Sequence, residues 1–211
     1  MTFPLYNDYI SLSCKKSFLE PKSTENKDLA AAAGAFRRTQ MSRQFVTEAV
    51  MLAIYGELLL TPVPVEYMVP YTSLLELYEF ISSDEQLMSN SDDDKHVKEK
   101  IKELVAYLDE PLNKKKIQKG LNMPWAKSSS ILIGETARIT VVNAMDTAPY
   151  GEFFDPVETE LLLVSQREQV PLLTDQPELI HRIIDAAVPV TVYDIDDFQF
   201  AVESDPFSHH I

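Results

Sequence analysis

The last third of the chain alternates between helix-like runs and apolar strand-like runs, and this alternation limits the fold more than any other feature. A helix-like run that begins at Asp155 is followed by the apolar segment 170–174. A second helix-like run, 177–187, is followed by the apolar segment 188–193. Strands joined by helices of this length are typical of parallel strands linked by crossovers. The pattern therefore predicts an α/β fold, in which a parallel β-sheet is flanked by helices.

Earlier segments extend this predicted sheet. Residues 65–69 alternate between apolar and polar side chains, and residues 137–142 are rich in β-branched residues, so both are expected to be strands. Residues 74–81 and 97–108 carry apolar side chains at helical spacing. At 211 residues, the chain fits a single domain, with a mainly helical insertion at about 82–136.

Two other segments lead to local expectations. Helical spacing begins at Asp28 and continues from Met41 to Leu60, which predicts helix across that region. Residues 82–96 are polar and acidic, and we expect them to form an exposed loop.

Composition restricts the function classes. The net charge of −14 opposes unassisted binding of a phosphate backbone and is typical of a soluble protein or of one that binds a basic partner. A single cysteine excludes an internal disulfide, and glycine is too scarce for a phosphate-binding loop. No apolar run is long enough to span a membrane, and the first residues lack the pattern of a signal peptide. These features predict a cytoplasmic protein.

Carboxylates gather where the predicted strands end and helices begin. Asp155 and Glu158 open one helix, Asp175 follows one strand, and an acidic group follows the last strand, comprising Asp194, Asp196 and Asp197. In an open parallel sheet these positions surround one crevice. Clustered carboxylates repel one another unless a hard divalent cation holds them, so the pattern predicts a Mg²⁺ or Mn²⁺ site.

Two blocks of the sequence resemble PIN-domain proteins, the metal-dependent ribonuclease fold that includes many toxins of bacterial toxin–antitoxin pairs. The first is the Met-Val-Pro-Tyr-Thr-Ser-Leu-Leu-Glu segment ending at Glu76. The second runs from Asp155 to Val190 and includes Leu-Leu-Thr-Asp and Val-Pro-Val. Together the blocks cover roughly half the chain, and motifs of this kind are hypotheses about structure and chemistry.

The resemblance implies about four carboxylates that hold one or two divalent cations for the hydrolysis of RNA. Matched position by position, the second acid is Glu76, the third is Asp155 or Glu158, and the fourth falls at Asp175. Family members more often carry the fourth acid two residues after the threonine, where this chain has Gln176. The first acid should end the opening strand, and Asp8 is the candidate.

Each acid also has a purely structural interpretation. Glu76 is equally consistent with a solvated helix face. Asp155, Pro156 and Glu158 match an N-cap, a first-turn proline and a capping box. Asp175 and Glu178 flank another proline and fit the same capping role. The acidic group after the last strand is better explained as a solvated strand end.

A basic run is the remaining candidate for binding RNA. It comprises Lys114, Lys115, Lys116 and Lys119, and Trp125 follows it as a surface on which a base could stack. A solvated loop after a helix is the commoner meaning of such a run.

Three function classes follow. The first is a metal-dependent ribonuclease, with Glu76, Asp155, Glu158 and Asp175 in the site and Mg²⁺ or Mn²⁺ as cofactor. The second is a catalytically inactive acidic protein on the same scaffold, which binds a basic protein partner or mimics nucleic acid. The third is a small-molecule enzyme on another doubly wound sheet, because a fold does not fix a function. A homo-oligomer is compatible with all three.

Overall fold

A computed structural model describes residues 43–84, 86–144 and 152–203. Asp8 and the helical pattern that begins at Asp28 lie outside these described residues. The described chain forms a six-stranded sheet in the order β3-β4-β2-β1-β5-β6. The strands are β1 (Arg43–Thr47), β2 (Val65–Pro70), β3 (Ile131–Leu132), β4 (Ala137–Val142), β5 (Leu172–Leu173) and β6 (Val192–Tyr193).

The sheet is parallel except at one edge. β1 pairs in parallel with both β2 and β5, β2 pairs in parallel with β4, and β5 does so with β6. Only β3 is antiparallel to its neighbour β4 among the named strand pairs. The predicted α/β fold is therefore confirmed, as is the parallel pairing of the last two strands.

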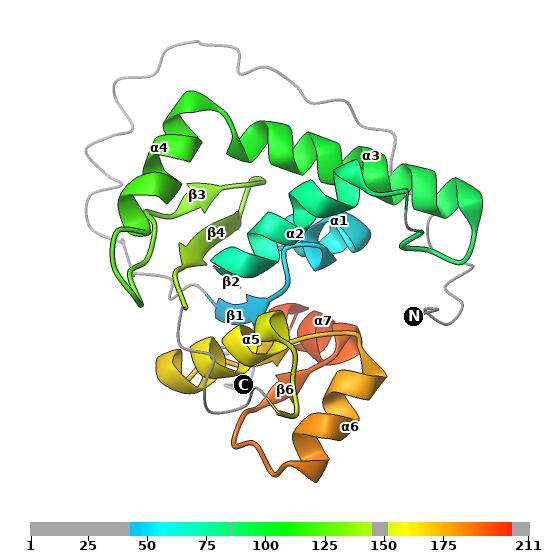
Figure 1. The fold of residues 1–211 in the computed structure, drawn as a ribbon, viewed down its shortest axis with the longest axis vertical. Coiled ribbons are helices and arrows are strands. Elements are labelled where there is room, and N and C mark those ends of the chain that lie inside the picture. Colours follow the sequence, from blue (N-terminus) through cyan, green and yellow to red (C-terminus); the bar gives the residue numbers. More distant parts are fainter. Residues whose placement is uncertain (1–42, 85, 145–151, 204–211) are drawn as a thin grey trace, which may run out of the picture.

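Helices connect the strands. They are α1 (Met51–Ile54), the 3₁₀-helix η2 (Gly56–Leu59), α2 (Tyr71–Ser82), α3 (Ser91–Leu108), α4 (Pro111–Gly120), α5 (Pro156–Glu168), α6 (Pro177–Asp185) and α7 (Ile195–Glu203). In Figure 1, α3 and α4 lie at one end of the molecule beside β3 and β4, and α6 lies at the other end. The region of the expected insertion thus contains α3, α4 and β3.

Alternation along the strands divides the core into two layers. Phe45, Tyr67 and Ile139 join a core with side chains of α1, α2, α3, α4 and α7. Val46 and Met68, one residue along their strands, join the opposite core with side chains of α5 and α6. Successive strand residues point to opposite faces, so a central sheet covered on both sides results. This three-layer arrangement holds the strand ends in place.

Three local expectations are wrong. Residues 43–47 form the central strand β1 instead of continuing a helix, because Phe45, Val46 and Thr47 are buried between two helical layers. The helix expected to start at 97 begins at Ser91, where Asn90 caps it by accepting a hydrogen bond from the Asp92 N–H at 3.0 Å. The last strand is limited to Val192–Tyr193.

The chain reverses its direction of sheet growth beside β1. From β1 it proceeds to β2 and then β4 on one side, and later to β5 and β6 on the other. Val46 pairs with Met68 on one side and Leu172 on the other, so the carboxyl ends of the three strands lie together. Such a reversal point opens a crevice at the carboxyl edge, which is where ligands bind in open α/β sheets.

Within the described part of the chain, no helix has both the length and the apolar character needed to cross a membrane.

Gly120 provides a direct test of the packing between α4 and the segment before β3. A Cβ atom at Gly120 would lie 2.3 Å from the Ser128 Cα, whereas a Cβ atom at Gly56 would meet nothing within 4 Å. We expect Gly120→Ala to lower the free energy of unfolding by about 1–3 kcal/mol through overpacking. Gly56→Ala should change it by less than about 0.5 kcal/mol. Urea denaturation measures both, and equal stability of the two variants would contradict this packing.

Candidate acidic site

Glu48 is the centre of the candidate site, although the sequence analysis did not select it. It follows the last residue of β1 and is 8% exposed. The next residue is anchored to α2, because the Ala49 N–H donates to the Ser73 Oγ at 2.8 Å. The central strand, its carboxyl end and the start of α2 therefore place a buried carboxylate at the reversal point of the sheet.

Burial and neighbouring carboxylates both disfavour the ionised form of Glu48. Burial, followed by the charges of four neighbouring carboxylates, raises the pKa of Glu48 from its ordinary value of 4.5 to about 8. In order of effect, these carboxylates are Glu76, Asp175, Asp155 and Glu158. The four acids that the sequence analysis selected are thus brought around one buried carboxylate that it missed.

Glu76 lies in the second turn of α2 and is half-buried, so its interpretation as a solvated helix face is wrong. Burial, then the charges of Asp155, Glu79 and Glu158, raises its pKa to about 7. Two carboxyl groups in this cluster are therefore held closer to neutrality than ordinary glutamates.

Asp155 and Glu158 form the capping box that the sequence predicts, and that structural interpretation is confirmed. The Glu158 N–H donates to the Asp155 Oδ1 at 2.8 Å, and the Asp155 N–H donates to the Glu158 Oε2 at 3.0 Å. The guanidinium of Arg182 on α6 forms an ion pair with the other oxygen of Glu158. Glu158 is therefore engaged on both oxygens, while Asp155 is exposed.

Asp175 does not cap α6, because Gln176 occupies the N-cap position and no side chain caps the helix. Instead, the Tyr55 hydroxyl donates a hydrogen bond to the Asp175 Oδ2. Gln176, at the position where the family resemblance implies an acid, donates its Nε2 to the Glu48 Oε1 at 2.9 Å. The amide of Gln176 therefore gives Glu48 a hydrogen-bond donor, whereas a carboxylate at position 176 would repel it.

A sixth carboxylate belongs to the neighbourhood but has a separate partner. Glu160 on α5 is buried, and it accepts a hydrogen bond from the Thr72 Oγ1 at 2.5 Å. Burial raises its pKa, while the hydrogen bonds from Thr72 act in the opposite sense. Glu160 therefore links α5 to the first turn of α2 and fixes the two helices that carry Asp155 and Glu76. Glu160 lies beside an apolar stretch, so the sequence around it does not indicate a functional role.

The donor set suits a hard cation in its chemistry, but it is not assembled around one. Carboxylate and amide oxygens are the ligands that Mg²⁺ and Mn²⁺ accept, and the groups that shift the pKa of Glu48 include no cationic side chain. In residues 43–84, 86–144 and 152–203, however, no three His, Cys, Asp or Glu side chains are grouped closely enough to hold a metal ion. Gln176 and Tyr55 each engage only one oxygen of Glu48 and Asp175, respectively.

The basic run forms no surface around these acids. It belongs to helix α4, so the expected loop is wrong. Lys114 pairs with Asp109 at 2.9 Å, and the Lys116 Nζ donates to the Ser130 carbonyl at 3.3 Å, whereas Lys115 and Lys119 are exposed. The groups that shift the pKa of Glu48 and Glu76 include none of these lysines.

Trp125 is also remote from the acidic site. It is half-buried, and the Arg167 guanidinium lies 4.6 Å from its ring centroid. Arg167 and Asp155 are at opposite ends of α5, which spans roughly 18 Å at the usual helical rise. The indole face that was a candidate for stacking on a base is thus occupied by an arginine.

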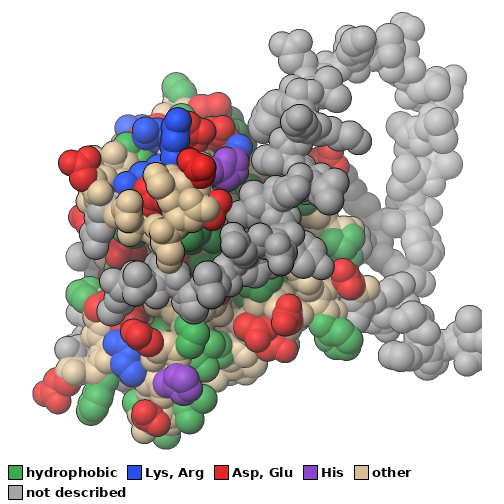
Figure 2. Space-filling view, turned by 90° about the vertical axis from the view of Figure 1, so that its right-hand side faces the viewer, with side chains coloured by type: hydrophobic (Ala, Val, Ile, Leu, Met, Phe, Trp, Pro, Cys, Tyr) green, Lys and Arg blue, Asp and Glu red, His purple; other side chains and the backbone are tan. Residues whose placement is uncertain are grey.

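The acidic group after the last strand has a structural role in part. The Asp197 N–H donates to the Asp194 Oδ1 at 2.8 Å at the start of α7, a helix that the sequence analysis did not predict. Figure 2 shows acidic side chains in the upper and lower parts of one face, whereas Lys and Arg gather mainly in the upper part. The lower part of this face therefore carries the excess negative charge.

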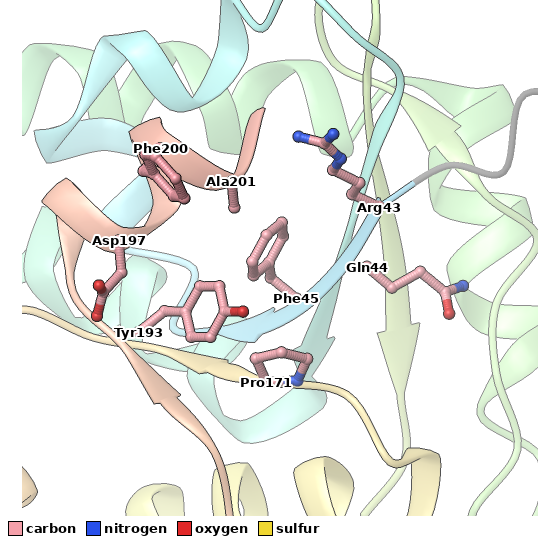
Figure 3. A pocket seen from close by; sticks show the side chains of 8 residues that line it. All are labelled: Arg43, Gln44, Phe45, Pro171, Tyr193, Asp197, Phe200 and Ala201. Atoms are coloured by element: carbon pink, nitrogen blue, oxygen red, sulfur yellow. The ribbon is translucent and has the colours of Figure 1, made fainter. Parts of the chain in front are cut away.

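A separate cavity of about 540 Å³ lies at the opposite end of β1 from Glu48 (Figure 3). Its wall is largely aromatic, with the rings of Phe45, Tyr193 and Phe200, and Arg43 and Asp197 lie at its sides. Gln44 points to the other side of the strand from Phe45. This cavity shares no lining residue with the acidic cluster, which is consequently a distinct feature of the carboxyl edge.

Comparison with protein-family models finds none that matches this chain, and comparison with curated proteins finds no significant match.

The raised pKa of Glu48 predicts a specific pH dependence of stability. Between pH 4.5 and about 8 this carboxyl is protonated in the folded protein and ionised in the unfolded chain. The folded state thus binds more protons, and the free energy of unfolding should fall as the pH rises through this range. Glu48→Gln keeps an acceptor for Gln176 and should remove most of that fall, raising the melting temperature at pH 8 by at least roughly 4 °C.

Glu99→Gln is the matched control, because Glu99 is an exposed carboxylate on α3. It should retain the pH dependence of the wild-type protein in thermal melts between pH 4.5 and 8.5. If Glu48→Gln follows the wild-type curve instead, the Glu48 carboxyl is not the buried acid described above.

Proposed function

We propose that the acidic cluster is a divalent-cation site and that the protein is a metal-dependent ribonuclease. The observation that supports this most is the Glu48 carboxyl at the reversal point of the sheet, whose pKa is raised by burial and then by the charges of four neighbouring acids. Helix capping and the ion pair with Arg182 explain Asp155 and Glu158, but neither explains why Glu48 is buried beside Glu76 and Asp175 at the expense of stability. Glu48, Glu76, Asp155 and Asp175 would hold the cation.

A cation bound there would polarise a phosphodiester and lower the pKa of a water molecule. The chain's own residues have separate tasks. Gln176 orients Glu48 through its amide hydrogen bond, and Tyr55 orients Asp175. Arg182 neutralises Glu158, which leaves that acid as a support for the first turn of α5 instead of a ligand. The resemblance to PIN-domain proteins supports RNA as the substrate.

One observation favours the alternative of an inactive acidic protein that binds a basic partner. Glu48, Asp175 and Glu158 each already have a partner within the chain, namely Gln176, Tyr55 and Arg182. Hydrogen-bonded in this way, the cluster can persist without a cation. The ribonuclease and the inactive acidic protein differ in whether a divalent cation binds the folded protein.

Thermal melting in Mg²⁺ or Mn²⁺ separates the two readings. A ligand that binds only the folded state stabilises it by about 2.7 kcal/mol at 100 times its Kd, which is a rise of roughly 5–10 °C in Tm for a chain of this size. Glu76→Gln should abolish that rise. Glu99→Gln, at an exposed acid on α3, should retain it. Melting curves that ignore both cations would favour the inactive protein.

Cleavage of a fluorescent single-stranded RNA tests the activity itself. We expect cleavage in Mn²⁺ that EDTA abolishes, because the carboxylates alone cannot activate water against a polyanion. Glu48→Gln should lose cleavage while remaining folded, and Glu99→Gln should retain it. An RNA that stays intact with wild-type protein in Mn²⁺ would rule out the ribonuclease.

A further inference from the structure

A cavity of about 400 Å³ adjoins the acidic cluster on its β5–β6 side. It lies at the carboxyl ends of these strands, between the first turns of α6 and α7, and Asp175 belongs both to its wall and to the cluster. Its size falls in the range of roughly 300–1,000 Å³ that is usual for sites of small ligands. A group bound in the cavity would consequently be next to the proposed cation site.

The wall combines flat apolar surface with polar groups. Its apolar part comprises Tyr55, Pro177, Ile180 and Ile195, and its polar part comprises Asp175, His181, Asp194 and Asp196. Three carboxylates exclude a phosphate group, whereas an aromatic ring and aliphatic side chains suit a neutral planar base. The cavity therefore favours the base of a nucleotide over its backbone.

Asp196 is the carboxylate that remains available to a ligand. Asp175 accepts from the Tyr55 hydroxyl, and Asp194 accepts from the Asp197 N–H at the start of α7. Among the described residues, the Asp196 side chain forms neither a hydrogen bond nor an ion pair, and it is exposed at the cavity wall.

The chemistry of a carboxylate selects among the bases. An ionised carboxylate only accepts hydrogen bonds, and its two oxygens match two adjacent donors. Guanine presents two adjacent N–H donors on its Watson–Crick edge. Adenine and cytosine place an acceptor nitrogen beside the amino group, and uracil flanks its single N–H with carbonyl oxygens, all of which repel a carboxylate.

We propose that this cavity binds a guanine base of the RNA and that Asp196 determines this specificity. The proposal rests on the proposed ribonuclease function, since it places the base beside the phosphodiester that the acidic cluster would address. Asp175 connects the two, because it lines the cavity and belongs to the proposed cation site.

Binding of the four nucleosides to the full chain, measured by isothermal titration calorimetry, tests the cavity without requiring cleavage. Guanosine should bind roughly 5- to 150-fold more tightly than adenosine, cytidine or uridine, which is the discrimination typical of a bidentate pair. Asp196→Asn places a donor opposite a donor and should abolish this preference. Asp185→Asn, at the exposed end of α6 outside the cavity, should retain it.

Several outcomes would overturn the proposal. Equal affinity for the four nucleosides, an unchanged preference in Asp196→Asn, or tighter binding of arginine methyl ester than of guanosine would each do so. The last result would identify the cavity as a site for a basic side chain of a protein partner.

Mapping the cleavage sites in a random RNA pool distinguishes this proposal from the ribonuclease on which it rests. Cleavage beside guanine that becomes indiscriminate in Asp196→Asn supports both. Metal-dependent cleavage without base preference overturns the guanine cavity alone. Selective binding of guanosine by a protein that leaves the pool intact supports the cavity and overturns the ribonuclease.

Discussion

The burial of one carboxylate, Glu48, is the constraint to which the rest of this carboxyl edge responds. Glu48 directly follows the central strand β1 and is only 8% exposed, so water solvates its charge poorly. An isolated buried carboxylate is costly, and four further acids increase that cost. The chain offsets it with a neutral amide donor from Gln176 and a raised pKa. Such an arrangement costs stability and is typical of functional sites.

The topology explains why acids from distant parts of the sequence meet here. β1 is flanked by β2 on one side and by β5 on the other, so the chain adds its later strands to both sides of β1. Acids just after β1 and β5, and on the helices that follow β2 and precede β5, therefore come near one another at the carboxyl edge of the sheet. Two contacts set the helices: Ser73 anchors α2 to the end of β1, and Thr72 bonds Glu160 of α5. The site thus depends on the fold as a whole.

Much of this arrangement could be predicted from the sequence, and the failures have physical causes. Strands 65–69 and 137–142 and the capping box at Asp155 have strong local signals, and the structure contains all three. β1 has only five residues, and a short apolar run cannot be distinguished from a buried helix segment by periodicity. Without β1 the sequence does not indicate Glu48, because the role of Glu48 depends on its position directly after that strand. The sequence does not predict the start of α3, because the acidic first turn of this helix resembles a loop. Acidic side chains nevertheless stabilise the N-terminus of a helix.

An acidic protein that acts on RNA must obtain its affinity without a basic surface. Lys114 and Lys116 of the basic run on α4 have internal partners, and Arg167 covers Trp125. On the proposed function, a cation between the acids and the phosphate supplies the attraction that lysines supply elsewhere. On the proposed guanine site, the neutral base would enter a cavity whose carboxylates repel the backbone, which would keep the phosphodiester outside the cavity and towards the cluster. On the proposed function, negative charge would therefore orient the substrate, and the net charge of −14 would be compatible with a polyanionic substrate.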